Sequence, residues 1–181
     1  MTTYIALLRG INVGGNRKVS MTDLKEFALG IGLENPRTLL QSGNLVFGSK
    51  ARSSKVLEQL LEKEADDRIG LQTNFLVRSA RELETSIARN PLPEPAKRDP
   101  AHLLLMFLKS VPETKDVKEL QAGITGRETV RADGAHLYID YCDGIGTSRF
   151  TGAVIERKLK TRGTARNWNT VLKLAALART D

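Results

Sequence analysis

The chain has very little cysteine, few aromatic residues and no long apolar segment. Cys142 is the single cysteine among 181 residues, which excludes an intramolecular disulfide and is typical of a reducing cytoplasm. No apolar run approaches the roughly 20 residues that a membrane-spanning helix needs. Residues 1–4 lack the basic region and cleavage site of a secretory signal. We therefore expect a cytoplasmic protein that does not cross a membrane.

The composition is that of a folded α/β protein, and its charge is concentrated at one end. Hydrophobic residues make up 40% and charged residues 27% of the chain, which argues against wholesale disorder. The net charge is +7, and residues 149–181 contain eight basic and two acidic residues. A localised basic excess attracts phosphates, acidic partners or nucleic acid. The alternative is a solvated surface kept soluble by Lys and Arg.

The hydrophobic periodicity of the first half predicts the order β-α-β-β-α-β, which is a ferredoxin-like unit. A loop over residues 10–19 follows the first strand, and Ser20 is expected to cap the helix that comes next. The pattern predicts strands over residues 3–9, 37–41, 44–47 and 71–77, and helices over residues 20–31 and 54–69.

The second half predicts the same order again, followed by a terminal helix. The sequence predicts strands over 101–108, 128–131 and 135–141, a short extended piece after 160, and helices over 80–89, around Val117 and Leu120, over 147–160 and over 167–178. Residues 90–95 contain three prolines, cannot continue a helix and mark the expected boundary. The predicted fold is α+β, with two ferredoxin-like subdomains over residues 1–95 and 96–181 and a C-terminal helix.

Two strand patterns predict what lies on the sheet faces. The opening strand of each half is apolar on both sides, so the other half, extra helices or a partner chain must cover the second face. In the strand over 135–141, His136, Tyr138, Asp140 and Cys142 share one face. Because this face is largely polar, we expect it to be wet.

The loop between the first strand and the first helix is the main candidate for a site. Its candidate residues are Arg9, Asn12, Gly14, Gly15 and Lys18. Backbone N–H groups of a glycine-rich loop can form an anion-binding concavity, and a helix N-terminus favours negative charge at the same place. The loop is not a P-loop, because Asn16 and Arg17 separate the last glycine from the lysine. The alternative is a turn that merely needs positive φ at its glycines.

The predicted topology brings a second polar segment to this loop. The first two strands run parallel, so the turn after the second strand shares an edge with the loop after the first. Gln41, Ser42 and Asn44 should therefore lie next to Arg9, and a polar pocket is reasonable there. Hydrogen bonds within the turns, from Asn12, Gln41 and Asn44, are the alternative.

Three blocks of the sequence carry a family resemblance. They are residues 6–15 with Met21 and Leu24, residues 41–47, and residues 166–170 with Leu174. Together, and in this order, they resemble the signature of the domain-of-unknown-function 1697 family, DUF1697, over essentially the whole chain. The resemblance implies a bacterial-type cytoplasmic protein with two ferredoxin-like α+β subdomains. It implies no established activity, catalytic residue or cofactor.

The third block adds three candidate ligand-binding residues, Arg166, Asn167 and Trp168. Asn167 is a good helix N-cap, and Arg166 before it can reach an anion. Trp168 can stack on a ligand ring, although an aromatic residue in an amphipathic helix is more often part of the core.

The loop over residues 142–149 and the two histidines are weaker candidates for a functional site. The loop over residues 142–149 leads from a strand into a helix that Thr147 or Ser148 would cap, and Asp143 is its candidate acid or base. His136 and Asp140 are about 13 Å apart along a strand, too far to chelate one metal ion with Cys142. His102 lies in an apolar strand and is expected to be packed.

The sequence thus favours a binding protein for a phosphate-bearing small molecule, with no cofactor, catalytic pair or metal identified. An electrostatic nucleic-acid-binding protein is one alternative, although the strand over 44–47 offers only Phe47 for base stacking. A protein-interaction or assembly module without catalysis is the other.

Overall fold

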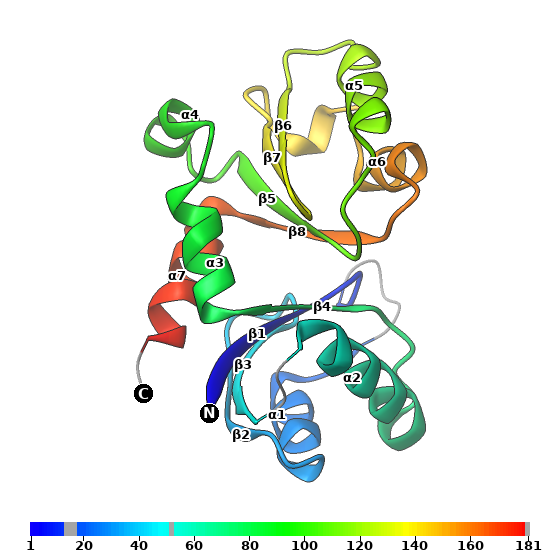
Figure 1. Ribbon diagram of the computed structural model, residues 1–181, viewed down its shortest axis with the longest axis vertical. Coiled ribbons are helices and arrows are strands. Elements are labelled where there is room, and N and C mark those ends of the chain that lie inside the picture. Colours follow the sequence, from blue (N-terminus) through cyan, green and yellow to red (C-terminus); the bar gives the residue numbers. More distant parts are fainter. Residues whose placement is uncertain (13–17, 51–52, 180–181) are drawn as a thin grey trace. The chain divides into compact units, whose positions relative to one another are not determined.

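The computed structural model describes residues 1–12, 18–50 and 53–179 of the chain (Figure 1). Contacts between residues group the chain into two compact units. Unit 1 comprises Met1–Thr85 with Lys173–Asp181, and unit 2 comprises Ser86–Leu172. The boundary of independently folding domains at residues 95 and 96 stays a prediction. Within the described residues, no helix combines the length and the apolar character needed to cross a membrane.

Unit 1 is a four-stranded antiparallel sheet with two helices. Its elements are β1 (Thr2–Leu8), α1 (Met21–Gly30), β2 (Glu34–Thr38), β3 (Asn44–Ser49), α2 (Ser54–Ile69) and β4 (Phe75–Ser79). The strand order is β2-β3-β1-β4, with Ile5 opposite Val46 and Ala6 opposite Val77. This order and connectivity are those of a ferredoxin-like unit and confirm the predicted fold class.

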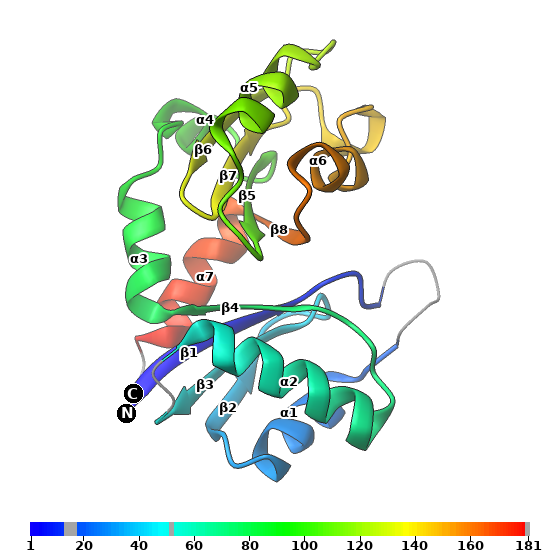
Figure 2. The same ribbon diagram turned by 45° about the vertical axis from the view of Figure 1, so that its right-hand side comes forward.

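One face of the sheet and both helices build the core of unit 1. Figure 2 shows α1 and α2 on the same side of this sheet. Tyr4, Ala6 and Leu8 of β1 belong to a buried cluster with residues of the two helices, namely Leu24, Phe27, Ala28, Leu57, Leu61 and Ala65. The alternate residues Ile5 and Leu7 are also about 1% exposed, which confirms that β1 is buried on both faces.

Unit 2 repeats the same sheet. After α3 (Ala80–Ala88), which begins in unit 1, its elements are α4 (Pro93–Arg98), β5 (Leu103–Leu108), α5 (Thr114–Ala122), β6 (Thr129–Asp133), β7 (His136–Asp140), a 3₁₀ turn (Ile145–Thr147), α6 (Gly152–Leu159) and β8 (Gly163–Asn167). The last helix, α7 (Trp168–Ala178), begins in unit 2 and ends in unit 1. The strand order is β6-β7-β5-β8, and all pairs are antiparallel. The second ferredoxin-like unit and the C-terminal helix are therefore confirmed as well.

Several element boundaries differ from the prediction. β4 begins at Phe75 instead of residue 71, because the Leu71 N–H binds the Ala65 carbonyl and the Thr73 hydroxyl binds the Arg9 carbonyl. β2 covers Glu34–Thr38 instead of residues 37–41, because Leu40, at φ 59°, turns the chain out of the strand. α6 begins at Gly152, and Thr151 caps it instead of Thr147 or Ser148.

The proline-rich segment ends α3, as predicted, but it is not only a linker. Pro93 and Pro95 lie in the short helix α4, which the sequence did not predict, and Pro93 is in its first turn. Proline is tolerated there because the N–H groups of the first turn have no helical acceptor.

The prediction of a wet face on β7 was wrong. Tyr138 is fully buried, and its hydroxyl donates to the Ser86 carbonyl at 2.7 Å. Asp140 is 6% exposed and accepts a hydrogen bond from Arg98 at 2.9 Å. The alternation of side chains along β7 assigns Tyr138 and Asp140 to one face correctly. This face is not wet, because Ser86 of α3 and Arg98 of α4 contact it.

Candidate functional site

The end of β1 and the turn between β2 and β3 meet at one edge of unit 1, as the topology predicts. The Leu8 N–H donates to the Gly43 carbonyl at 2.9 Å, and Asn12 Nδ2 donates to the Gln41 carbonyl at 2.7 Å. The described residues 9–12, 18–20 and 39–44 form this edge, which we call the rim of unit 1. Gly14 and Gly15, two predicted ligand-binding residues, lie outside the described residues.

Asn12 holds the rim together. Its Oδ1 accepts from the Val19 N–H at 3.1 Å, and its Nδ2 donates to the Val19 carbonyl at 3.0 Å as well as to Gln41. Both amide hydrogens and the amide oxygen are therefore engaged within the protein. This is the turn-stabilising alternative that the sequence left open, and it applies to Asn12.

Asn44 has the same structural role on the other segment. It is fully buried, and its Nδ2 donates to the Leu39 carbonyl at 2.8 Å and to the Ser42 hydroxyl at 3.0 Å. Asn12 and Asn44 thus shape the rim with the amide hydrogens that the sequence suggested for a ligand.

The rim has a tightly turning backbone, and its charged side chains are basic. Gly10, Asn12, Leu40 and Gly43 all have positive φ, between 53° and 73°. Lys18 is exposed and Arg9 is half-buried, while Gln41 and Ser42 are exposed on the turn. Neither residues 9–20 nor residues 38–48 contain an acidic residue.

The third sequence block lies in unit 2, where its residues are built into the structure. Arg166 is buried, and its guanidinium donates to the Thr164 hydroxyl and the Ala165 carbonyl. Burial lowers the pKa of Arg166 to about 10, so the side chain is still charged at neutral pH. Asn167 caps α7, because its Oδ1 accepts from the Thr170 N–H at 2.9 Å. Trp168 is 5% exposed and packs against Tyr138 with ring centroids 6.4 Å apart, which supports the core interpretation.

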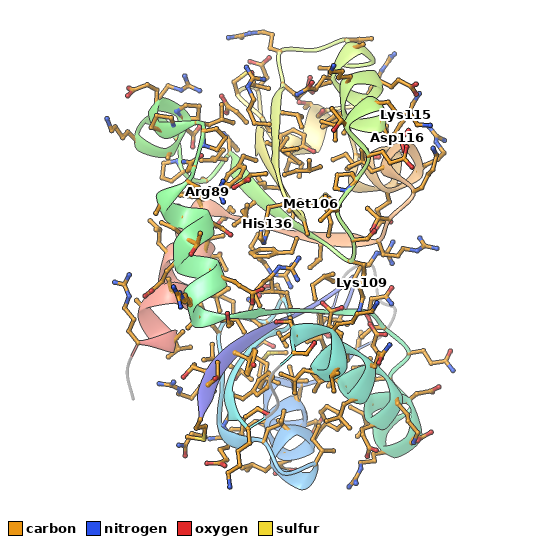
Figure 3. All side chains as sticks on the ribbon, viewed as in Figure 1. Arg89, Met106, Lys109, Lys115, Asp116 and His136 are labelled. Carbon is orange, nitrogen blue, oxygen red and sulfur yellow. The ribbon has the colours of Figure 1, made fainter. Side chains whose placement is uncertain are left out.

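The basic C-terminal segment presents less free charge than its composition suggests. Lys160 donates to both carboxylate oxygens of Asp116, which Figure 3 labels on α5. Arg162 lies 3.5 Å from Glu156, and Arg179 bonds Glu84 at 2.6 Å. With Arg166 buried, half of the eight basic residues are paired with an acid or removed from the surface, which weakens the nucleic-acid alternative.

Unit 2 contains a pocket that the sequence did not predict. Its volume is about 320 Å³, and residues of the loops 123–128 and 141–150 line it together with Val154 of α6. The sequence drew attention to the second of these loops through its glycines. The first loop also contains two glycines and a glutamate, but no signal in the sequence linked it to the second.

Charged and polar groups tie the two pocket loops together. Arg127 pairs with Asp143 at 2.8 Å, and the Cys142 thiol donates to the Arg127 carbonyl. Asp143, the predicted acid or base, is thus an exposed partner of an ion pair. Glu128 Oε1 accepts from the Ser148 hydroxyl, whereas Glu128 Oε2 is buried with no donor among the described residues.

The aromatic wall of the pocket is buried. The Tyr141 hydroxyl donates to the Phe150 carbonyl at 2.6 Å, and the two rings lie 6.2 Å apart. Burial, together with the charge of Glu128, raises the pKa of Tyr141 to about 12. The phenol is therefore neutral at physiological pH.

His102 is half-buried just before β5, and its Nδ1 lies 2.7 Å from Asp99 Oδ2, so it is paired with a carboxylate instead of being packed in a strand. In the part of the chain that the structure describes, no group of three or more His, Cys, Asp or Glu side chains is placed to hold a metal ion.

Comparison with known proteins agrees with this architecture. The conserved bacterial protein SP0830 from Streptococcus pneumoniae has a similar structure, with a TM-score of 0.73 and 22% sequence identity. The similarity covers 98% of this chain and 99% of that one, and at this identity it concerns the fold alone. No curated protein matches the chain. Residues 1–138 match the family described as "Protein of unknown function (DUF1697)", which confirms the family that the sequence resembles; the third block, over residues 166–170 with Leu174, lies outside the matched residues. The chain therefore belongs to the DUF1697 family.

Proposed function

We propose that the chain is a cytoplasmic binding protein for a small phosphate-bearing ligand, with the rim of unit 1 as its site. The observation that carries the proposal is the hydrogen bond from Asn12 to the Gln41 carbonyl. It joins two segments that carry cations and amides and contain no acidic residue. A phosphate at such an edge meets positive charge from both Arg9 and Lys18.

The start of α1 supports an anion at the same edge. Ser20 caps the helix by accepting from the Asp23 N–H at 3.0 Å, and Lys18 lies two residues before this cap. The partial positive charge of a helix N-terminus adds to that of the lysine. The Asn12 side chain already binds Val19 and Gln41 when no ligand is present. We therefore expect these rim residues to lose little conformational entropy when a ligand binds.

The ligand is expected to interact mainly through charge. Asn12 and Asn44 use their amide hydrogens within the protein, so the rim attracts a phosphate chiefly through the positive charge of Arg9 and of the exposed Lys18. Such binding weakens with increasing salt, because exposed charges are screened within about 10 Å at 0.1 M ionic strength.

Thermal unfolding with added ligands tests the proposal. Inorganic phosphate, a nucleoside monophosphate and a sugar phosphate are added in increasing concentration, and at least one should raise the melting temperature. Lys18→Ala and Arg9→Ala should each abolish most of this shift.

Lys25→Ala is the matched control for Lys18→Ala. Lys25 is an exposed lysine of α1 in the same unit, so its removal changes the net charge equally without touching the rim. An equal loss in both lysine variants, or no shift with any of the three ligands, would contradict the proposal.

A further inference from the structure

We propose that the pocket of unit 2 is a second, separate site, and that it takes a small zwitterion, an α-amino acid with an apolar side chain. The inference does not depend on the site in unit 1. It rests on three properties of the pocket: its size, the two charges left over on its lining and its apolar wall.

The volume of about 320 Å³ suits a molecule of amino-acid size. Pockets for small ligands usually enclose about 300–1,000 Å³, so this one lies at the small end. Ile124, Phe150 and Val154 give it an apolar wall, and Phe150 is only 7% exposed.

Two of the four charged residues on the lining neutralise each other. Arg127 and Asp143 form an ion pair at 2.8 Å across the two loops. Glu128 and Arg149 remain, one of each sign. No ion pair or hydrogen bond joins the Arg149 side chain to any described residue, and it is exposed at the pocket.

Glu128 has an unfilled acceptor. Ser148 satisfies Oε1, but Oε2 is buried and accepts from no described donor. A buried acceptor without a donor is destabilising, because the desolvation of the oxygen is not compensated, and such groups are uncommon in folded proteins. An ammonium group supplies the missing donor and also neutralises the carboxylate.

The access to this oxygen depends on Gly126. A Cβ at Gly126 would overlap Glu128 Oε2, so the backbone of the loop lies directly against the carboxylate. Residues 125–127 are exposed, and this part of the loop must shift for an ammonium group to reach Oε2. Arg149 then faces the carboxylate of the same ligand from the other loop.

Calorimetric titration with free amino acids tests the inference, using leucine, valine, methionine and glycine as probes. The apolar amino acids should bind and glycine should bind more weakly. The N-acetyl derivative of a bound amino acid should lose the contact with Glu128, and its amide should lose the contact with Arg149. Each blocked form should bind at least about tenfold more weakly, as expected when one charge-assisted interaction is lost.

Two variants and their controls assign the charges. Glu128→Gln keeps the shape and the Ser148 contact, and Arg149→Ala removes the cation; both should weaken binding of the free amino acid at least about tenfold. Glu119→Gln and Arg157→Ala change exposed residues of α5 and α6 outside the pocket and should leave affinity unchanged. The inference is overturned if no amino acid binds the wild-type protein, if blocked forms bind as well as free ones, or if the pocket variants behave like the controls. The blocked ligands give this answer with the wild-type protein even if a variant fails to fold.

Discussion

The two units have the same sheet topology, but their long connections differ in position. Unit 1 has its long connections at one edge of its sheet, and unit 2 has them at the other edge of its own sheet. At the edge where the first strand ends, the connection from the first strand to the first helix and the hairpin turn cover residues 9–20 and 39–43 in unit 1, whereas their equivalents in unit 2 are shorter and cover residues 109–113 and 134–135. Unit 1 places its rim at this edge. In unit 2 the equivalent edge is a short connection and a tight hairpin.

At the other edge the relation is reversed. Unit 1 has short connections over residues 31–33 and 50–53, whereas unit 2 has residues 123–128 and 141–151, which form its pocket. A fold does not determine a function, since sites are built on loops that a stable sheet holds in place. The repeat therefore concerns the scaffold, and we expect each unit to carry its own ligand site.

The largest expected effect comes from the two glycines of the equivalent hairpin turns. Gly43 has φ 73°, and a Cβ there would lie 2.9 Å from Leu8 Cβ and overlap Ile11. Gly134 has φ 56°, and a Cβ there meets nothing within 4 Å. Gly43→Ala should therefore lower the free energy of unfolding by about 3–4 kcal/mol, and Gly134→Ala by only about 1–2 kcal/mol. Urea-induced unfolding measures both, and equal losses would show that the turn of unit 1 is no more tightly packed than that of unit 2.

A smaller loss of stability is expected when the Asn12 hydrogen bonds at the rim of unit 1 are removed. Asn12→Ala removes three hydrogen bonds at a partly exposed site and should lower the free energy of unfolding by about 1–2 kcal/mol. Asn169→Ala, at an exposed position of α7, should change it by less than about 0.5 kcal/mol. If the two variants were equally stable, Asn12 would not hold the rim.

The smallest effect concerns the pH dependence of unit 2. Burial raises the pKa of Tyr141 and of Tyr138 to about 12. The unfolded chain ionises a tyrosine near pH 10, so each of these residues stabilises the fold below pH 10 and loses this contribution as the pH rises from 10 to 12. Tyr141→Phe should be less stable than wild type at pH 8, because the Phe150 carbonyl loses its donor.

The difference between wild type and Tyr141→Phe should then shrink above pH 10, by at most about 1.4 kcal/mol per pH unit. Urea-induced unfolding at several pH values from 8 to 11.5 provides the measurement. A constant difference over this range would mean that Tyr141 ionises equally easily in the folded and unfolded chain.

The sequence predicted most of the scaffold because the scaffold depends on local patterns. The apolar spacing in residues 54–69 matches α2 at both ends, and Ser20 caps α1 as its position suggested. The two-sided apolar strands and the shared edge of unit 1 followed from alternation and topology. These features need no knowledge of distant contacts.

The features that were missed depend on residues far apart in the chain. Tyr138 is buried, and its hydroxyl donates to the Ser86 carbonyl, 52 residues away; alternation within a strand does not reveal such a partner. The pocket arises because Glu128 and Ser148 meet from separate loops. Likewise, the local sequence does not reveal that Asn12 donates its amide hydrogens to the Val19 and Gln41 carbonyls.

Backbone NMR shift mapping of the whole chain shows whether each unit has its own ligand site, the rim in unit 1 and the pocket in unit 2. A nucleoside monophosphate and then leucine are titrated into the labelled protein. We predict that the nucleotide shifts amide signals of residues 9–20 and 39–44, and that leucine shifts those of residues 123–128 and 141–150. Shifts of one common set of residues by both ligands, or shifts confined to other segments, would show that the rim and the pocket are not two separate sites.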